Sequence, residues 1–100
     1  MFIATNRFQI REGREEDFEQ VWRGRDSYLD EVPGFKQFQL LRGPTEEGLT
    51  LYVSHSLWAS RDAFEAWTRS EAFRKAHSRA GSPEGVVAGH PKLEAFEVVL

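Results

Sequence analysis

The most informative region of this chain reads Trp58-Ala-Ser-Arg-Asp-Ala-Phe-Glu-Ala-Trp67-Thr-Arg-Ser-Glu-Ala-Phe-Arg-Lys-Ala-His77-Ser-Arg-Ala80. It predicts two short helices in tandem, because Ser60 and Ser70 are both suitable N-caps and an acidic residue follows each of them in the first turn. The second helix has an apolar stripe at positions i, i+3, i+4 and i+7, made of Phe73, Ala76, His77 and Ala80. We therefore expect His77 to lie on the buried face of this helix and Trp67 to point inward from the helix before it.

His77 has two interpretations from the residues alone. A lone histidine on an apolar face is most often a core residue whose ring is hydrogen-bonded to a nearby backbone carbonyl. Alternatively, neutral imidazole is the commonest nitrogen ligand of metals, and a dry pocket suits the iron of a haem. The pattern of the second helix leaves both interpretations open.

Length and composition limit the class of protein. The 100 residues predict one domain, 1–100, and 13% of them are aromatic, which is enough to line a flat ligand site. The net charge of -3 argues against a nucleic-acid partner. The absence of cysteine excludes disulfides, thiolate nucleophiles and iron–sulfur clusters. With no signal-like start and no long apolar run, we expect a cytoplasmic protein without a membrane partner.

The first strand contains a polar residue on its apolar side. Residues 2–10 alternate in polarity, and Asn6 is in phase with Phe2 and Phe8. Burying an amide without partners costs on the order of 1–3 kcal/mol, so some group must satisfy it. Asn6 is either a structural residue bonded to a neighbouring loop or a donor directed at a bound ligand.

The remaining elements predict the fold class. A long helix is expected from Glu15 to near residue 31, strands at 35–43 and 49–58 with a polar connection over 43–48, an irregular loop over 81–91 and a final strand over 92–100. The order β-α-β-β-α-α-β is typical of an α+β, ferredoxin-like split βαβ sandwich with its helices on one face. Neither middle strand has a cleanly polar face, so we expect a second subunit to cover the other face.

Most common catalytic motifs are absent from the sequence. There is no dinucleotide or phosphate-binding glycine motif, no paired-histidine zinc motif and no serine nucleophile elbow. His55 lies within a predicted strand and His90 in the predicted loop, so neither forms a close ligand cluster with His77. Asn6, Trp67 and His77 remain, and they predict a crevice in which a planar metal macrocycle could lie.

Four segments carry a resemblance to a known family. They are Asn6-Arg-Phe8, Gly13-Arg-Glu-Glu-Asp-Phe-Glu19, Val32-Pro-Gly-Phe35 and Ala66-Trp-Thr-Arg-Ser-Glu-Ala-Phe-Arg-Lys-Ala-His77. Over essentially its whole length the chain resembles the antibiotic biosynthesis monooxygenase superfamily, and within it the IsdG-type haem-degrading monooxygenases. The superfamily in general lacks the haem-binding histidine, so the segment from Trp67 to His77 is the discriminating motif. The resemblance implies a homodimer with a dimeric α+β barrel.

The resemblance also implies roles for the candidate residues. His77 binds the haem iron, Asn6 donates an N–H to dioxygen, Trp67 presses on the porphyrin plane, and Phe73 belongs to the cofactor-binding set. Haem is then both cofactor and substrate: its ring is opened with O2, iron is released, and a separate reductase or small reductant supplies the electrons. Arginines are candidate partners of the haem propionates, namely Arg7, Arg25, Arg74 and Arg79.

Two other functions remain open on the same fold. One is a cofactor-independent monooxygenase acting on an aromatic or quinone metabolite, which would not need His77. The other is a non-catalytic haem-binding protein, which would use His77 but would leave the macrocycle intact.

Overall fold

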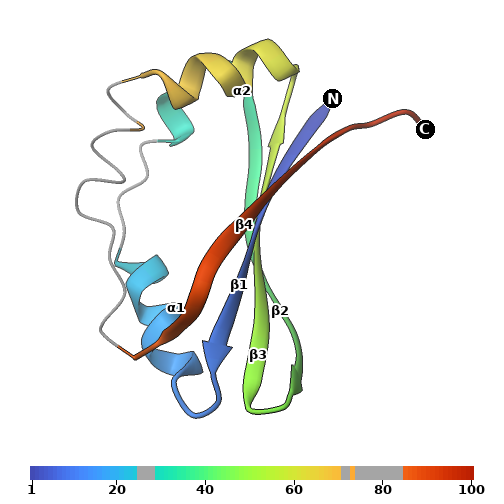
Figure 1. Cartoon of the computed structure of the whole chain (residues 1–100). Helices are drawn as coiled ribbons and strands as arrows, with labels where there is room; N and C mark the ends of the chain where they lie inside the picture. The colour runs from blue at the N-terminus through green and yellow to red at the C-terminus, as the bar shows by residue number, and fades with distance from the viewer. Residues whose placement is uncertain (25–28, 71–72, 74–84) are drawn as a thin grey trace.

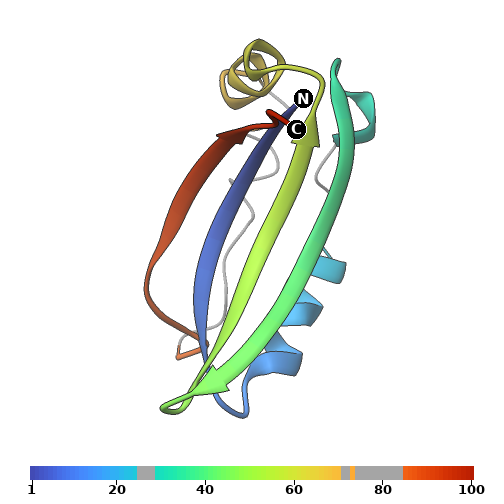
Figure 2. The ribbon, with the colours of Figure 1, turned by 90° about the vertical axis from the view of Figure 1, so that its right-hand side faces the viewer.

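The computed structural model describes residues 1–24, 29–70, 73 and 85–100. One sheet of four antiparallel strands carries both helices on a single face (Figure 1). The elements in chain order are β1 (Phe2–Arg11), α1 (Glu15–Arg23), the 3-10 helix η1 (Leu29–Glu31), β2 (Phe35–Glu46), β3 (Leu49–Trp58), α2 (Arg61–Thr68) and β4 (Val87–Glu97). The strand order is β2-β3-β1-β4, as Figure 2 shows from the side without helices, and it confirms the predicted ferredoxin-like α+β fold. In this described part of the chain, no helix is long and apolar enough to cross a membrane.

The two faces of the sheet differ in what they contact. We call the face beneath the helices the covered face; its central residues are Phe2, Ala4, Asn6, Phe8 and Ile10 of β1 and Thr50, Tyr52, Ser54, Ser56 and Trp58 of β3. We call the other face the open face, and there β3 presents Leu49, Leu51, Val53, His55 and Leu57. This division of β3 is the one that the sequence predicts. It follows from the strand period of two.

Two carboxylates attach α1 to the covered face. Glu15 and Glu19 are four residues apart, so they lie on the same side of the helix. Glu15 accepts a hydrogen bond of 2.8 Å from the Thr50 hydroxyl, and Glu19 accepts one of 2.5 Å from the Tyr52 hydroxyl. The bond from Thr50 holds the pKa of Glu15 below its usual value, while burial and the bond to Glu19 raise the pKa of Tyr52 to about 12.

Helix α2 begins where the sequence predicts and packs closely on the chain before β2. The Ser60 hydroxyl caps it by accepting the N–H of Ala63 at 3.1 Å. Gly34 has a φ of +85°, and a Cβ placed there would lie 2.5 Å from the Cβ of Ala63. A glycine at this position therefore permits both the backbone conformation and the close approach of the helix.

The first helix is shorter than the sequence predicts. It ends at Arg23, with Gly24 as its C-cap, and not near residue 31. Glycine has a low helix propensity, and the N–H of Gly24 bonds to the carbonyl of Gln20 as the helix closes. The apolar residues Leu29 and Val32 continue the helical spacing, but Leu29 lies in a separate 3-10 helix.

Two predicted loops are partly strand. The connection predicted over 43–48 is reduced to a turn at Glu47 and Gly48, which have φ values of 54° and 79°, because β2 continues through Pro44 to Glu46. The final strand begins at Val87 and not at residue 92, so His90 and Pro91 lie in a strand and not in the predicted loop. A bulge opposite Phe8 and the edge position of β4 allow a strand to contain Gly89 and Pro91.

Tyr52 predicts a loss of stability at alkaline pH. Its pKa in the folded state lies above the unfolded value near 10. Its contribution to stability is therefore complete below about pH 10 and decreases as the pH rises towards 12. In urea unfolding followed by circular dichroism, Tyr52→Phe should show a smaller decline between pH 10 and 12 than the wild type. Equal declines in the two proteins would contradict the assignment.

A substitution at Gly34 should destabilise the fold by overpacking against Ala63, and this effect can be separated from backbone strain. Gly34→Ala should lower the free energy of unfolding by about 2–4 kcal/mol, through strain at positive φ together with overpacking against Ala63. Gly48→Ala is the matched control, because its φ is +79° and no atom lies within 4 Å of the added Cβ. It should cost only about 1–2 kcal/mol. Equal losses in urea unfolding would show that the contact with Ala63 is unimportant.

Candidate functional site

The covered face carries two separate apolar clusters. The first, which we call the α2 cluster, has the buried residues Phe2, Ala4, Leu29 and Trp58, with Phe64 and Trp67 of α2 packed against it. The second, the α1 cluster, has the buried residues Ile10, Phe18, Tyr52 and Val86, with Phe8 and Trp22 packed against it. Helices α2 and α1 lie over opposite ends of the sheet (Figure 1). The aromatic side chains of these two clusters therefore form two walls, and the middle of the covered face lies between them.

Asn6 lies at this boundary. Its covered-face neighbours along β1 are Ala4 of the α2 cluster and Phe8 of the α1 cluster. The side-chain oxygen Oδ1 of Asn6 is enclosed, and no hydrogen bond from any described residue reaches it. The predicted inward orientation of Asn6 is confirmed. Its interpretation as a structural asparagine bonded to a loop finds no support in the described part of the chain.

Ser54 is a residue of this boundary that the sequence analysis missed. It lies on β3 directly opposite Asn6, so both side chains point to the covered face. Its position in phase with Tyr52 and Trp58 is visible in the sequence. The pairing with Asn6 is not, because it depends on the strand register.

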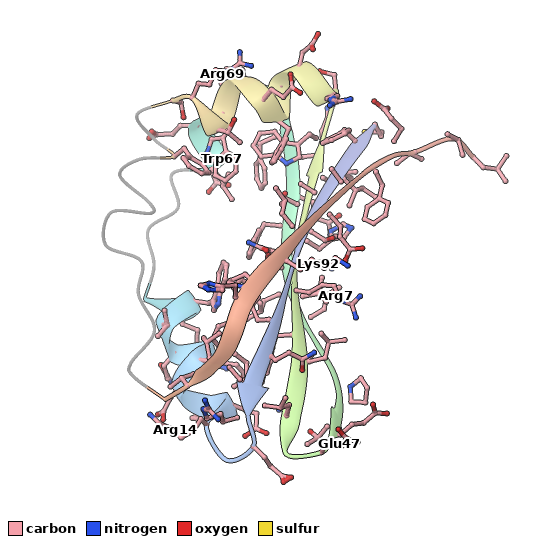
Figure 3. All side chains as sticks on the ribbon, viewed as in Figure 1. Arg7, Arg14, Glu47, Trp67, Arg69 and Lys92 are labelled. Atoms are coloured by element: carbon pink, nitrogen blue, oxygen red, sulfur yellow. The ribbon has the colours of Figure 1, made fainter. Side chains whose placement is uncertain are left out.

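Trp67 is held by aromatic contacts on the inner side of α2, as predicted. Its ring centroid lies 5.2 Å from that of Trp58 and 6.1 Å from that of Phe64. Phe73 meets the Trp67 ring edge to face, at 4.8 Å and an interplanar angle of 84°. Figure 3 shows Trp67 beneath the α2 ribbon. Trp67 and Phe73 thus form one aromatic unit, and Trp67 joins that unit to the α2 cluster.

A groove runs beside α2 on the side of the 31–34 segment. Its volume is about 520 Å³, and its lining residues are Glu31, Val32, Pro33, Gly34, Ala59, Ser60, Ala63, Ala66, Trp67 and Ser70. Trp67 therefore borders this groove as well as the α2 cluster. Asn6 is not among its lining residues.

Of His77 and the four candidate arginines, only Arg7 lies in the described part of the chain. His77, Arg25, Arg74 and Arg79 lie outside the described residues. Arg7 projects from the open face, away from Asn6, and its Nε lies 3.8 Å from a carboxylate oxygen of Glu94 (Figure 3). The structure therefore excludes Arg7 as a propionate partner for a ligand on the covered face.

No group of three or more histidine or carboxylate side chains within the described segments could hold a metal ion. His55 lies within β3 as predicted, while His90 is exposed on β4.

The middle of the covered face has the chemistry of a site for a flat, largely apolar ligand. Such sites combine aromatic and aliphatic walls with a few polar groups that fix the orientation of the ligand. Here the walls are the two clusters, and the polar groups are the carboxamide of Asn6 and the hydroxyl of Ser54. The enclosed oxygen of Asn6 can only accept a hydrogen bond, so only a ligand that donates one would satisfy it. Its burial without a partner costs on the order of 1–3 kcal/mol.

Comparisons with known proteins give relatives that share this architecture. A heme oxygenase (mycobilin-producing) from Mycobacterium tuberculosis is 35% identical over 98 residues, which cover 98% of this chain and 89% of that protein. The structure of the heme-degrader MhuD from Mycobacterium tuberculosis, with two hemes bound in its active site, matches with a TM-score of 0.73 and 30% identity. That match covers 100% of this chain and 97% of MhuD.

A cofactor-independent oxygenase, SnoaB from Streptomyces nogalater, shares the fold with a TM-score of 0.70 and 21% identity. The match covers 99% of this chain and 93% of SnoaB. The family model named antibiotic biosynthesis monooxygenase matches residues 1–79. Because this match spans more than half of the chain, the chain belongs to the antibiotic biosynthesis monooxygenase family.

Proposed function

We propose that this protein is a haem-degrading monooxygenase. Haem is both substrate and cofactor: the enzyme opens the porphyrin ring with O2 and external electrons, and iron is released. The similarity to a mycobacterial heme oxygenase over nearly the whole chain supports this function, as does the similarity to a haem-bound structure of MhuD. From the structure itself, the observation that carries the proposal is the position of the Asn6 carboxamide on the covered face, between two aromatic walls.

Four residues are assigned roles in this reaction. Asn6 orients dioxygen by hydrogen bonding, and one such donor changes a rate by about 10²–10³ where charge develops in the transition state. Trp67 and Phe73 form the aromatic surface against which the macrocycle lies. His77 is assigned as the axial ligand of the iron from the resemblance and from its place in the apolar stripe that the sequence predicts for residues 73–80.

The proposed electron donor is a separate reductase or a small reductant. The sequence has no dinucleotide-binding glycine motif, so the electrons come from outside the chain. The absence of cysteine fits a reducing compartment. We therefore place the reaction in the cytoplasm.

The proposed assembly is a homodimer that joins two open faces. This face presents Leu51, Val53 and Leu57 from the central strand β3, flanked by Leu41 and Phe96, which are 43% and 48% exposed. Large apolar side chains on one side of a sheet are typical of a surface that another layer covers. A second copy of the same face provides that layer with closed twofold symmetry.

The shared fold of a cofactor-independent oxygenase supports an alternative function. The fold is shared with SnoaB, a cofactor-independent oxygenase, and the described part of the chain contains the aromatic walls that a flat metabolite would also need. A monooxygenase acting on an aromatic or quinone metabolite is therefore the alternative. A non-catalytic haem-binding protein is the third possibility.

Titration with haem separates the three functions. The wild type should bind haem with a shifted Soret band, and the band should disappear after ascorbate is added in air with catalase present. A Soret complex that survives this treatment indicates haem binding without degradation, whereas no complex at all indicates the cofactor-independent alternative.

Two variants test the assigned roles. His77→Ala should abolish the shift of the Soret band, because the axial nitrogen is lost. Asn6→Ala should still bind haem but should lose at least about 10²-fold in the rate of degradation. Undiminished degradation by either variant contradicts its role.

The open face predicts the assembly state. Val53→Asp places a charge in the middle of the proposed interface and should convert the dimer to a monomer in size-exclusion chromatography with light scattering. Gln20→Glu adds the same charge on the exposed side of α1 and should leave the dimer intact. A wild type that is monomeric at all concentrations would rule out the proposed dimer.

A further inference from the structure

Ser54 differs from the other hydroxyl residues on the covered face of β3. The hydroxyls of Thr50 and Tyr52 donate to Glu15 and Glu19 of α1. The hydroxyl of Ser56 donates to the carbonyl of Ala4 at 3.2 Å and accepts the indole N–H of Trp58 at 2.9 Å. In the described part of the chain, Ser54 is the member of this row whose hydroxyl makes no such bond.

Ser54 lies across the sheet from Asn6, whose amide oxygen has no hydrogen-bond partner in the described part of the chain. Ser54 and Asn6 are directly opposite each other in the β1–β3 pairing, and side chains in such pairs have their Cβ atoms about 4.5–5.5 Å apart. Both residues are half-buried, and the Oδ1 of Asn6 is fully enclosed. Ser54 and Asn6 are therefore neighbouring polar residues of the covered face whose side-chain groups are not used for hydrogen bonds within the described protein, so both are free to contact one ligand.

The surroundings of the pair are apolar. On β2 the residue opposite Ser54 is Leu40, and on β4 the residue opposite Asn6 is Leu93. Leu93 is 62% exposed although it points to the covered face, so apolar surface is open to a ligand beside Asn6. A row across the sheet thus places two polar groups between two leucines, which suits a ligand with a polar centre and an apolar periphery.

We propose that Ser54 is a second substrate-facing polar residue of the site. Its hydroxyl would hydrogen-bond, beside the carboxamide of Asn6, to a small polar ligand of the bound haem. This inference rests on the proposed haem function and deepens it. It assigns the hydrogen bonds that orient the polar ligand to two residues, Asn6 on β1 and Ser54 on β3.

The test measures anion binding to the ferric haem complex. Fluoride is the probe, because its affinity for ferric haem responds to nearby hydrogen-bond donors. Ser54→Ala should weaken fluoride binding about three- to ten-fold, the range of one net hydrogen bond, and should shift the visible absorption bands of the fluoride complex. Ser54→Thr keeps the hydroxyl and should restore the affinity to within about two-fold of the wild type.

Two controls separate this role from a structural one. Ser56→Ala removes a hydroxyl from the same strand and face that is already bonded within the protein. It should lower thermal stability and leave fluoride affinity unchanged. The double variant Asn6→Ala/Ser54→Ala should lose less affinity than the product of the two single losses, because both residues act on one ligand.

The outcomes distinguish this inference from the proposed function. A wild type without a haem complex overturns both. A wild-type haem complex whose fluoride affinity is unchanged in Ser54→Ala overturns the role of Ser54 alone. If circular dichroism shows that Ser54→Ala does not fold, Ser54→Cys replaces it, since a thiol is a weaker donor of similar size and should also reduce the affinity.

Discussion

The register of β1 against β3 is the constraint on which the rest of the structure depends. The two central strands pair without interruption from Phe2 opposite Trp58 to Arg11 opposite Leu49. A shift of one residue would turn every side chain to the other face of the sheet. The observed register places both aromatic walls under the helices and brings Asn6 opposite Ser54. It also directs Arg7 away from them.

The hydroxyls of β3 are used for two different purposes. Thr50 and Tyr52 hold α1, and Ser56 holds the indole of Trp58, so the ends of the covered face are fixed by hydrogen bonds as well as by apolar packing. A buried hydroxyl with a good partner adds rigidity at little net cost. With both walls fixed in this way, the strands that carry the proposed polar pair are held in place between them. Such preorganisation would reduce the entropy lost on binding at the proposed site.

The sequence predicted correctly the features that follow from hydrophobic periodicity. It predicted wrongly the end of α1 and the start of β4, which depend on local exceptions to the usual rules. The alternation of β1 correctly placed Asn6 on the apolar side, and the helical spacing correctly turned Trp67 inward. The length of α1 was wrong because Leu29 and Val32 keep the apolar period beyond Gly24, where the helix has already closed. The start of β4 was wrong because glycine and proline usually indicate a loop, and a bulge in an edge strand is the exception. The face on which Ser54 lies could be read from its alternation with Tyr52 and Trp58, but its pairing with Asn6 could not, because that pairing depends on the strand register.

The two outer strands share a feature that bears on assembly. Pro44 lies in β2 and Pro91 in β4, and at both places the pairing with the inner strand is irregular. A proline has no N–H to offer to another strand, and a bulge bends the edge out of line, so neither border of the sheet presents a continuous ladder for an incoming chain. Edge-to-edge growth into fibres is thereby discouraged on both sides. The proposed homodimer would instead use the broad surface of the sheet, where association ends after a single pairing.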